Sequence, residues 1–135
     1  MYRDRIRLPS LLDKVMSAAD AAALIQDGMT VGMSGFTRAG EAKAVPHALA
    51  ERAKVTPLKI SLMTDASLGN DLDKQLTEAG VLSRRMPFQV DSTLRKAINA
   101  GEVMFIDQHL SETVEQLRNQ QLTPVSYTHL TQPTK

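Results

Sequence analysis

The 135-residue sequence contains no cysteine. This absence excludes a disulfide framework, a thiolate nucleophile and a thiolate metal site. The sequence also has no excess of charge of one sign, because 16 Lys and Arg residues stand against 15 Asp and Glu residues. A net charge of +1 gives no electrostatic reason to expect a nucleic acid or a membrane surface as a partner.

Long apolar runs are missing as well, and none is long enough to span a membrane. The basic residues 1–7 lead into Leu8-Pro9-Ser10, whereas a secretory signal requires an uninterrupted apolar segment at that point. We therefore expect a cytoplasmic protein with no membrane partner. Histidine is scarce too: His47, His109 and His129 lie far apart, so no metal site is predicted.

Helical patterns alternate with short apolar runs along the chain. This alternation predicts an α/β fold, a Rossmann-like, mostly parallel sheet with flanking helices. The expected N-caps are Ser17, Asn70, Asp91 and Ser111, and the expected helix ends are Gly28, Gly80 and Gly101. A further helix is expected over residues 43–53. Strands are expected at residues 29–34, 58–64 and 103–106, and residues 86–90 are expected to be an edge piece or a loop because they contain Pro87.

The segment Gly35-Phe36-Thr37-Arg38-Ala39-Gly40, called the glycine loop below, joins an expected strand to an expected helix. Ligands bind beyond the carboxyl ends of parallel strands, and this loop lies at such an end. A phosphate-binding Walker A loop would continue with Lys and then Ser or Thr, whereas Glu41 and Ala42 follow here. The glycine spacing also fails the dinucleotide fingerprint. The loop is therefore either a backbone that approaches a ligand closely, with amide donors at a helix entrance, or a tight turn alone.

Two other polar features have both a functional and a structural interpretation. The pair Arg84-Arg85 is either an anion-recognition site or a solvated surface. His109 follows an expected strand, and a hydrogen bond that braces a loop is favoured over catalysis. His47, on an expected helix, is interpreted as a partly exposed structural residue.

Taken together, several segments resemble the opening of the acetyl-CoA hydrolase/transferase family, the class I coenzyme A transferases that include succinyl-CoA:acetate CoA-transferases. The resemblance covers roughly Tyr2 to Leu122 in the family's order. It is carried by residues 31–40, 43–46, 48–50, 60–64, 85–89, 94–99 and 107–111.

The resemblance implies two similar α/β domains with the active site between them, and ping-pong covalent catalysis. In this family a glutamate attacks the acyl-CoA, and a glutamyl-CoA thioester then passes CoA to a carboxylate or to water. That glutamate lies in the C-terminal half of the family's chain, and no glutamate of this sequence matches it. The resemblance therefore implies an inactive fragment of a homodimeric enzyme. Its substrates are an acyl-CoA and a carboxylate, with no permanently bound cofactor.

Within this chain, the resemblance assigns substrate contacts to the glycine loop and to two neighbouring strand ends. The candidate residues are Gly35, Phe36, Thr37, Gly40, Thr64 and His109. One departure lies at Asp65, where family members usually have glycine. If that position needs a positive φ, Asp65 is expected to add strain of about 1 kcal/mol. The alternative function is a small non-catalytic α/β module that binds a carboxylate or a phosphate.

Residues 123–135 are set apart from the rest of the sequence. They break the alternation, and Val125-Ser126-Tyr127-Thr128-His129-Leu130 reads as the translation of a common transposase sequencing adapter. We therefore expect a partial, truncated domain over residues 1–122 and an artefactual tail over 123–135, with a genuine polar tail as the alternative. A truncated sheet leaves an edge and apolar helix faces uncovered, so poor solubility is expected.

Overall fold

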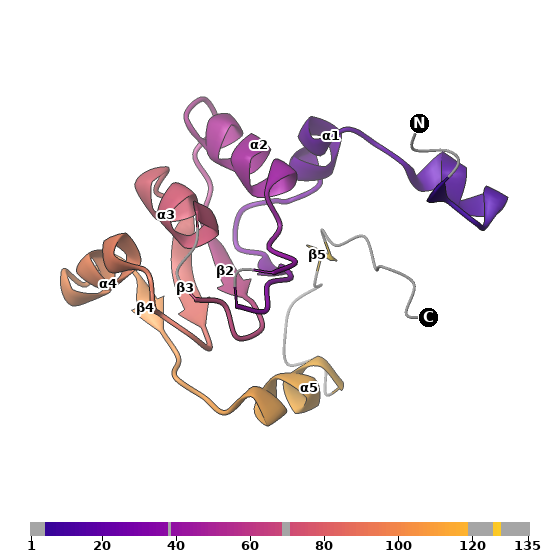
Figure 1. The fold of residues 1–135 in the computed structure, drawn as a ribbon. Helices are drawn as coiled ribbons and strands as arrows, with labels where there is room; N and C mark the ends of the chain where they lie inside the picture. Colours follow the sequence, from indigo (N-terminus) through magenta and orange to yellow (C-terminus); the bar gives the residue numbers. More distant parts are fainter. Residues whose placement is uncertain (1–4, 38, 69–70, 119–125, 128–135) are drawn as a thin grey trace.

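The computed structural model describes residues 5–37, 39–68, 71–118 and 126–127 (Figure 1). Eleven elements follow one another along these residues. In chain order they are η2 (Pro9–Lys14), α1 (Ala18–Ala23), β1 (Thr30–Gly32), α2 (Ala44–Ala53), β2 (Ile60–Met63), α3 (Asp71–Glu78), β3 (Leu82–Met86), α4 (Ser92–Asn99), β4 (Met104–Phe105), α5 (Leu110–Arg118) and β5 (Ser126–Tyr127).

The strands form one sheet in the order β4-β3-β2-β1-β5, and every pairing is parallel. Parallel neighbours require crossover connections, and α2, α3 and α4 supply them between β1 and β4. The predicted α/β fold with a parallel sheet and flanking helices is therefore confirmed. Strand β3 lies inside the sheet, between β2 and β4.

Helices α1 to α4 lie in a row, each in contact with the next, along the sheet (Figure 1). Helix α5 lies apart from this row, on the side toward which the strand arrows point. The segment η2 stands away from the sheet and has no buried residue. The core therefore belongs to the sheet and to the row of four helices.

The core consists of aliphatic side chains from the strands and from the helix faces that cover them. Leu72 and Leu76 of α3 and Leu94 and Ala97 of α4 are buried, as their helical spacing predicts. The strands contribute Val31, Ile60, Leu62 and Leu82, each of them 1% exposed or less. Burying such side chains stabilises a fold by about 1.5–3 kcal/mol each.

Several predicted helix boundaries are confirmed. The Ser17 hydroxyl accepts a hydrogen bond from the Asp20 amide at 3.1 Å, and Asp91 caps α4 through the Leu94 amide at 2.9 Å. Gly80 and Gly101, at the ends of α3 and α4, have φ values of +67° and +77°. Glycine adopts these left-handed conformations without steric cost, which explains why the helices end there.

Three boundaries differ from the prediction. Helix α1 ends at Ala23, so the predicted helix end Gly28 lies in a turn beyond it. The extended segment expected at residues 86–90 is the interior strand β3 at Leu82–Met86, and Pro87 follows it. Helix α5 begins at Leu110, so Ser111 lies inside its first turn and does not cap it. The predicted cap Asn70 lies outside the described residues.

Candidate functional site

The glycine loop follows β1 and is held by its own backbone. The amides of Phe36 and Ala39 donate to each other's carbonyls at 3.1 and 2.9 Å. The Ser34 hydroxyl donates to the Gly40 carbonyl at 2.8 Å, which joins the two ends of the loop. Gly40 has a φ of +67°, a conformation that favours glycine. These bonds define the shape of the loop.

Thr37 at the tip of the loop contacts the neighbouring strand end. Its amide donates to the Ala66 carbonyl at 2.7 Å, and Thr37 forms a parallel bridge with Ser67. Thr37 has a φ of +54°, which is an outlier for a β-branched residue. The amides of Phe36, Thr37 and Ala39 are therefore committed to carbonyls of the protein itself. Phe36 is 61% exposed.

Gly35 is buried, although its conformation does not require glycine. A Cβ built there meets the Cβ of Ser67 at 3.8 Å and the Cα of Glu41 at 3.9 Å, which are ordinary van der Waals distances. Gly35 thus lies where the glycine loop, the strand end at Ser67 and the entrance to α2 meet. A side chain at this position would fill the space between these segments.

The second strand end, residues 64–67, follows β2 and is called the Thr64 loop below. Thr64 is 3% exposed, and its hydroxyl donates to the Asp65 carbonyl at 2.8 Å and lies 3.1 Å from the Ser67 hydroxyl. The φ of Asp65 is not positive, so the strain considered for an aspartate at this position does not arise. The Asp65 carboxylate accepts a hydrogen bond from the Ala66 amide at 2.8 Å.

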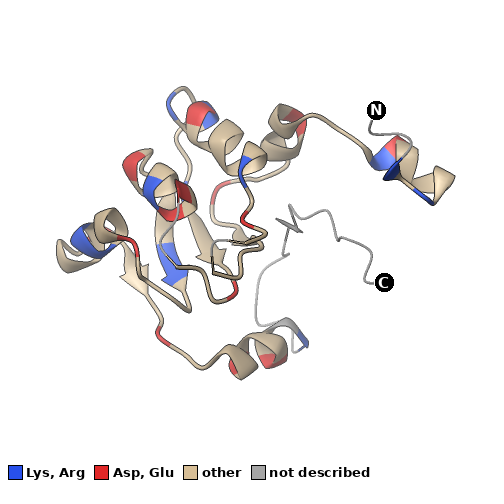
Figure 2. Cartoon of the chain, in the orientation of Figure 1, with Lys and Arg blue, Asp and Glu red and all other residues tan. Residues whose placement is uncertain are grey.

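For Arg85, the structure contradicts both interpretations of the Arg84-Arg85 pair. Arg85 is fully buried, so it forms neither a solvated surface nor an open anion site. Its Nε lies 2.6 Å from Oδ1 of Asp73 in α3, and Asp73 is only 2% exposed. Figure 2 shows this basic stretch on β3, with acidic residues on α3 nearby. Side chains alternate along a strand, so Arg84 and Arg85 lie on opposite faces of β3. This alternation could have indicated that one of the two arginines is buried, but only if β3 had first been recognised as a strand.

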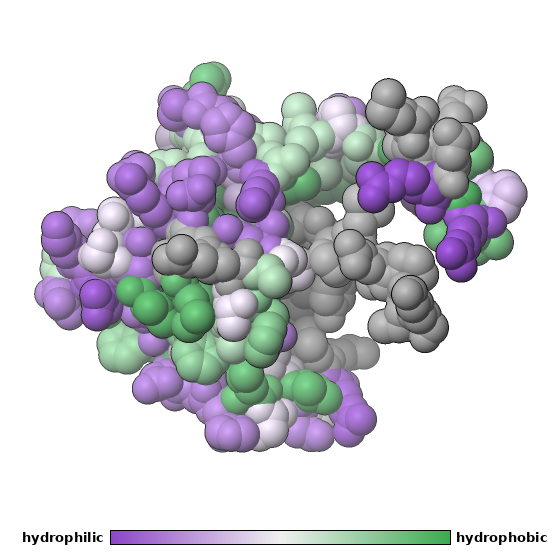
Figure 3. Space-filling model, in the orientation of Figure 1, coloured by the Kyte–Doolittle hydropathy of each residue, from purple (hydrophilic) through white to green (hydrophobic). Residues whose placement is uncertain are grey.

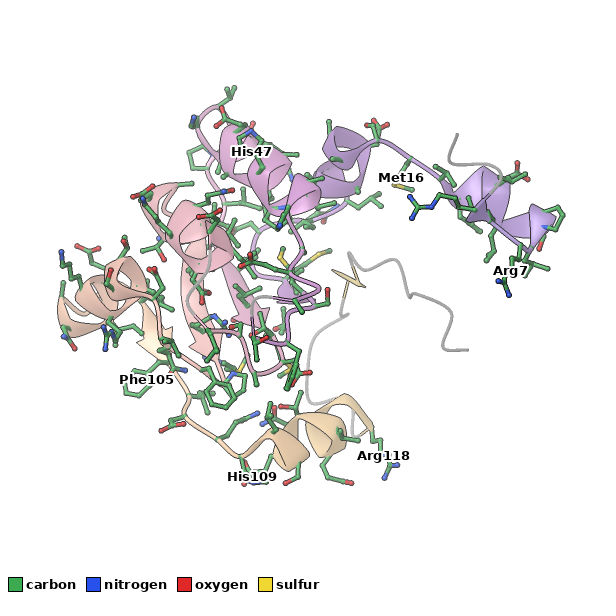
Figure 4. The ribbon with its side chains drawn as sticks, viewed as in Figure 1. Arg7, Met16, His47, Phe105, His109 and Arg118 are labelled. Carbon is green, nitrogen blue, oxygen red and sulfur yellow. The ribbon has the colours of Figure 1, made fainter. Side chains whose placement is uncertain are left out.

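His109 is not brought to the glycine loop. It precedes α5, and its Nδ1 accepts a hydrogen bond from the Ser111 amide at 3.3 Å and lies 2.8 Å from the Ser111 hydroxyl. Figure 4 shows His109 at the outer rim of α5, which itself lies apart from the sheet. The hydrogen bond expected of a bracing His109 is thus present at the first turn of α5, and its assignment to the substrate stays a prediction. Of the six candidate residues, the structure groups Gly35, Phe36, Thr37, Gly40 and Thr64.

A cavity of about 420 Å³ opens beside the glycine loop, between the starts of α2 and α3. It was not found from the sequence, because its walls come from two helices whose packing the sequence pattern does not specify. Its lining residues are Glu41, Ala42, Lys43, Ala44, His47, Asp71, Leu72 and Gln75. Among the described residues, the buried Oε1 of Gln75 has no hydrogen-bond partner.

Glu41 is a titratable group in the wall of this cavity, and its pKa is shifted in the folded chain. Burial raises the pKa of its carboxyl, and the negative charges of Asp71 and Asp73 add to that effect. A hydrogen bond from the Leu72 amide, at 3.3 Å, opposes the rise in pKa. The cavity wall therefore combines one carboxyl of raised pKa with the cationic side chain of Lys43 and the imidazole of His47.

In the described part of the chain, no three His, Asp or Glu side chains are grouped so that they hold a metal ion. Over the same residues, no helix has the length and apolar character needed to cross a membrane. The arrangement at the carboxyl end of the sheet consists instead of two loops, a buried ion pair and a neighbouring cavity.

The chain belongs to the acetyl-CoA hydrolase/transferase family. The family model for the acetyl-CoA hydrolase/transferase N-terminal domain matches residues 4–131. The matched range extends past Leu122 into the segment 123–135, and the domain boundary at residue 122 stays a prediction.

Three curated relatives illustrate this membership. A succinyl-CoA:acetate CoA-transferase of Clostridium kluyveri is 41% identical over 113 residues, which are 82% of this chain and 21% of the relative. A propanoyl-CoA:succinate CoA transferase of Escherichia coli is 45% identical over 105 residues, 74% of this chain and 21% of the relative. An acetyl-CoA hydrolase of Saccharomyces cerevisiae is 35% identical over 115 residues, which are 82% of this chain and 22% of the relative. The chain thus spans about a fifth of the length of these relatives.

A solved structure has the same fold. The crystal structure of a variant of the decarboxylase AibA/AibB matches with a TM-score of 0.58 over 76% of this chain and 41% of that chain. The two sequences are 21% identical over this match, so the likeness concerns the fold alone.

Proposed function

We propose that this chain forms the amino-terminal part of an enzyme that acts on short-chain acyl-CoA, either as an acetyl-CoA hydrolase or as a carboxylate CoA-transferase. The observation that carries the proposal is the family match over residues 4–131. The relatives' names include both activities, so the choice between water and a carboxylate as the acceptor stays open.

The chemistry we propose is a covalent relay through a glutamate that this chain does not supply. The glutamate carboxylate attacks the acyl-CoA thioester, and exchange gives a glutamyl-CoA thioester with release of the acyl carboxylate. In a transferase, an acceptor carboxylate then takes up the CoA as a new acyl-CoA; in a hydrolase, water hydrolyses the glutamyl-CoA thioester and free CoA leaves. Either step regenerates the glutamate carboxylate. This chain alone is therefore expected to have no transferase or hydrolase activity.

The glycine loop is the part of this chain that we assign to the reacting carboxylates. Its location at the carboxyl ends of β1 and β2 supports the assignment, because ligands of parallel sheets bind at that edge. Phe36, 61% exposed, offers an apolar surface beside the loop for a short acyl chain. Thr64, which is buried behind the loop, is assigned to its support.

A chimera tests this proposal. The segment of the Escherichia coli propanoyl-CoA:succinate CoA transferase that aligns with this chain is replaced by the corresponding segment of this chain, which is 45% identical. We expect the chimera to retain CoA transfer between propanoyl-CoA and succinate. A matched chimera with Gly40→Val is expected to lose it, because a β-branched residue cannot easily adopt a φ of +67°. A folded chimera without activity would reject the proposal.

The alternative is a self-contained module that binds a carboxylate or a phosphate without chemistry. The commitment of the Phe36, Thr37 and Ala39 amides to protein carbonyls does not separate the two functions, because it withholds these donors from an anion in both. Thermal unfolding of the 135-residue chain with and without acetate, succinate, phosphate or CoA decides the matter. A rise in Tm that saturates with one of these ligands would favour the module, since a ligand of the native state stabilises it.

A further inference from the structure

Arg85 lies on an interior strand of the sheet and forms an ion pair with a single carboxylate, that of Asp73. Arg85 is the penultimate residue of β3, and its side chain has no exposed surface. Nε and Nη2 of Arg85 meet Oδ1 and Oδ2 of Asp73 at 2.6 and 3.2 Å, a two-pronged contact with the first turn of α3.

The guanidinium has donors left over after this ion pair, and they are directed to the ends of two strands. Nη1 of Arg85 donates to the carbonyl of Met86, the last residue of β3. Nη2 donates to the hydroxyl of Ser67 at 2.7 Å, and that hydroxyl lies 3.1 Å from the hydroxyl of Thr64. Arg85 therefore connects α3, the end of β3 and the Thr64 loop.

The Thr64 loop in turn supports the tip of the glycine loop. The Thr37 amide donates to the carbonyl of Ala66, the residue before Ser67, at 2.7 Å. Thr37 and Ser67 are also paired across a parallel bridge. The unfavourable φ of Thr37, +54°, persists only if its surroundings hold it, and these two contacts lie on the segment that Arg85 holds.

Burying an ion pair costs free energy, because both charges lose their hydration. Replacing such a pair with apolar residues of similar volume is often neutral or stabilising, so stability alone does not account for it. Its fixed hydrogen-bond directions, by contrast, define the position of every group that it contacts.

We propose that Arg85, held by Asp73, is a positioning residue that fixes the tip of the glycine loop through Ser67 and the Thr64 loop. The ligand-related part of this inference rests on the proposed function, because it assumes that the glycine loop meets the substrate carboxylate. The positioning itself stands on the hydrogen bonds described above.

Amide hydrogen exchange of the 135-residue chain, followed by NMR, tests the positioning. Ser67→Ala removes the hydroxyl that links Arg85 to the Thr64 loop and leaves the ion pair with Asp73 intact. We expect the Thr37 amide to exchange about tenfold faster, because one hydrogen bond to a charged donor is lost. The Tm is expected to fall as well, because a buried donor of Arg85 is left unpaired, but the amides of β1 and β2 are expected to change less than that of Thr37.

The matched control is Ser83→Ala. The Ser83 hydroxyl lies on the same strand as Arg85 and donates to the Ile60 carbonyl at 2.8 Å, away from the Thr64 loop. This variant is expected to leave Thr37 exchange unchanged. Equal Thr37 exchange in the two variants would overturn the proposal. If Ser67→Ala does not fold, Arg85→Lys takes its place, because lysine keeps the positive charge beside Asp73 but loses the hydrogen bond to Ser67. Thr37 exchange that is no faster in Arg85→Lys would then overturn the proposal.

A titration with sodium acetate separates this inference from the proposed function. If acetate shifts the Thr37 amide resonance in the unmodified chain and does so less strongly in Ser67→Ala, both are supported. If Ser67→Ala loosens Thr37 while acetate leaves the resonance of both chains unchanged, the positioning stands and the assignment of the loop to carboxylates is rejected.

Discussion

Arg85 and Phe105 are paired in register on neighbouring parallel strands. The charged residue of this pair is buried and the apolar residue is exposed, the opposite of what their polarity would suggest. Arg85 of β3 is fully buried, whereas Phe105 of β4 is 54% exposed and the adjacent Met104 is 64% exposed. Figure 3 shows hydrophobic surface running from the region of β4 toward α5. The position of a strand in the sheet, and not the polarity of the residue, separates these two neighbours.

The difference has a physical cause on each side. Arg85 lies in a strand with neighbours on both edges, and four hydrogen bonds, three of them to side chains, satisfy its donors there. Phe105 lies in a two-residue strand at the end of the strand order, where β3 is its one neighbour among the described strands. A polar side chain is tolerated inside when every donor is paired, and an apolar one stays outside when nothing covers it.

The largest expected effect comes from breaking the buried side of this comparison. Asp73→Ala leaves the Arg85 charge buried without its partner, which is expected to lower the free energy of unfolding by about 3–5 kcal/mol. The measurement is the urea midpoint at neutral pH. Asp71→Ala, in the same turn but exposed, is the control and is expected to cost less than about 0.5 kcal/mol. Similar losses in the two variants would show that the ion pair has no special role.

A smaller effect is expected at the tip of the glycine loop, which Arg85 supports. Thr37→Gly removes a side chain that disfavours a φ of +54°, so the free energy of unfolding is expected to rise by about 1 kcal/mol. The same substitution at Thr56, whose φ is not positive, is expected to lower it. Urea unfolding of both variants checks this, and a loss of stability in Thr37→Gly would show that its side-chain contacts outweigh the strain.

The exposed side of the comparison is tested by Phe105→Lys. Because Phe105 is already 54% exposed, the free energy of unfolding is expected to change by less than about 0.5 kcal/mol. A lysine on an edge strand opposes edge-to-edge pairing, so self-association is expected to fall. Sedimentation velocity over a range of concentrations measures this. An unchanged association together with a large loss of stability would place Phe105 in the core.

The smallest effect is expected from Glu41, a half-buried group between these extremes. Burial raises the pKa of Glu41 in the folded chain, so the folded state binds this proton more tightly than the unfolded state does. The free energy of unfolding therefore falls as the pH rises from the usual glutamate pKa to the raised pKa of the folded chain. Glu41→Gln is therefore expected to be slightly more stable than the unmodified chain at neutral pH and indistinguishable from it below the usual glutamate pKa.

Glu51 provides a control of opposite sign. Its hydrogen bond to Lys54, at 2.5 Å, lowers the pKa of its carboxyl, so its contribution to stability is present at neutral pH and is lost as pH falls. Glu51→Gln is expected to be slightly less stable than the unmodified chain at neutral pH. Urea midpoints of both variants at several pH values measure the two signs. The same sign for both variants would contradict the role of burial at Glu41.

Much of the fold follows from local patterns. The capping bonds at Ser17 and Asp91 and the helix ends at Gly80 and Gly101 depend on residues a few positions apart, so they could be predicted. Strand β3 could not, because Ser83, Arg84 and Arg85 interrupt the apolar run by which a buried strand is recognised.

The candidate site divides along the same line. The glycine loop and Thr64 are at strand ends, and the alternation of helices and strands is enough to place them on one edge of the sheet. The hydrogen bond from the Thr37 amide to the Ala66 carbonyl joins residues from different crossover units, and the cavity beside Glu41 forms between two helices. Neither has a signature in the order of residues.

By itself, the sequence determined the α/β class, the parallel direction of the strands that crossover helices impose, and the edge of the sheet at which the candidate site lies. These depend on periodicity and on capping, which act over a few residues. Only the tertiary structure decided that Arg85 lies inside beside Asp73 and that Phe105 lies outside. The burial of a side chain depends on which strands and helices surround it, and contacts between distant parts of the chain set those surroundings.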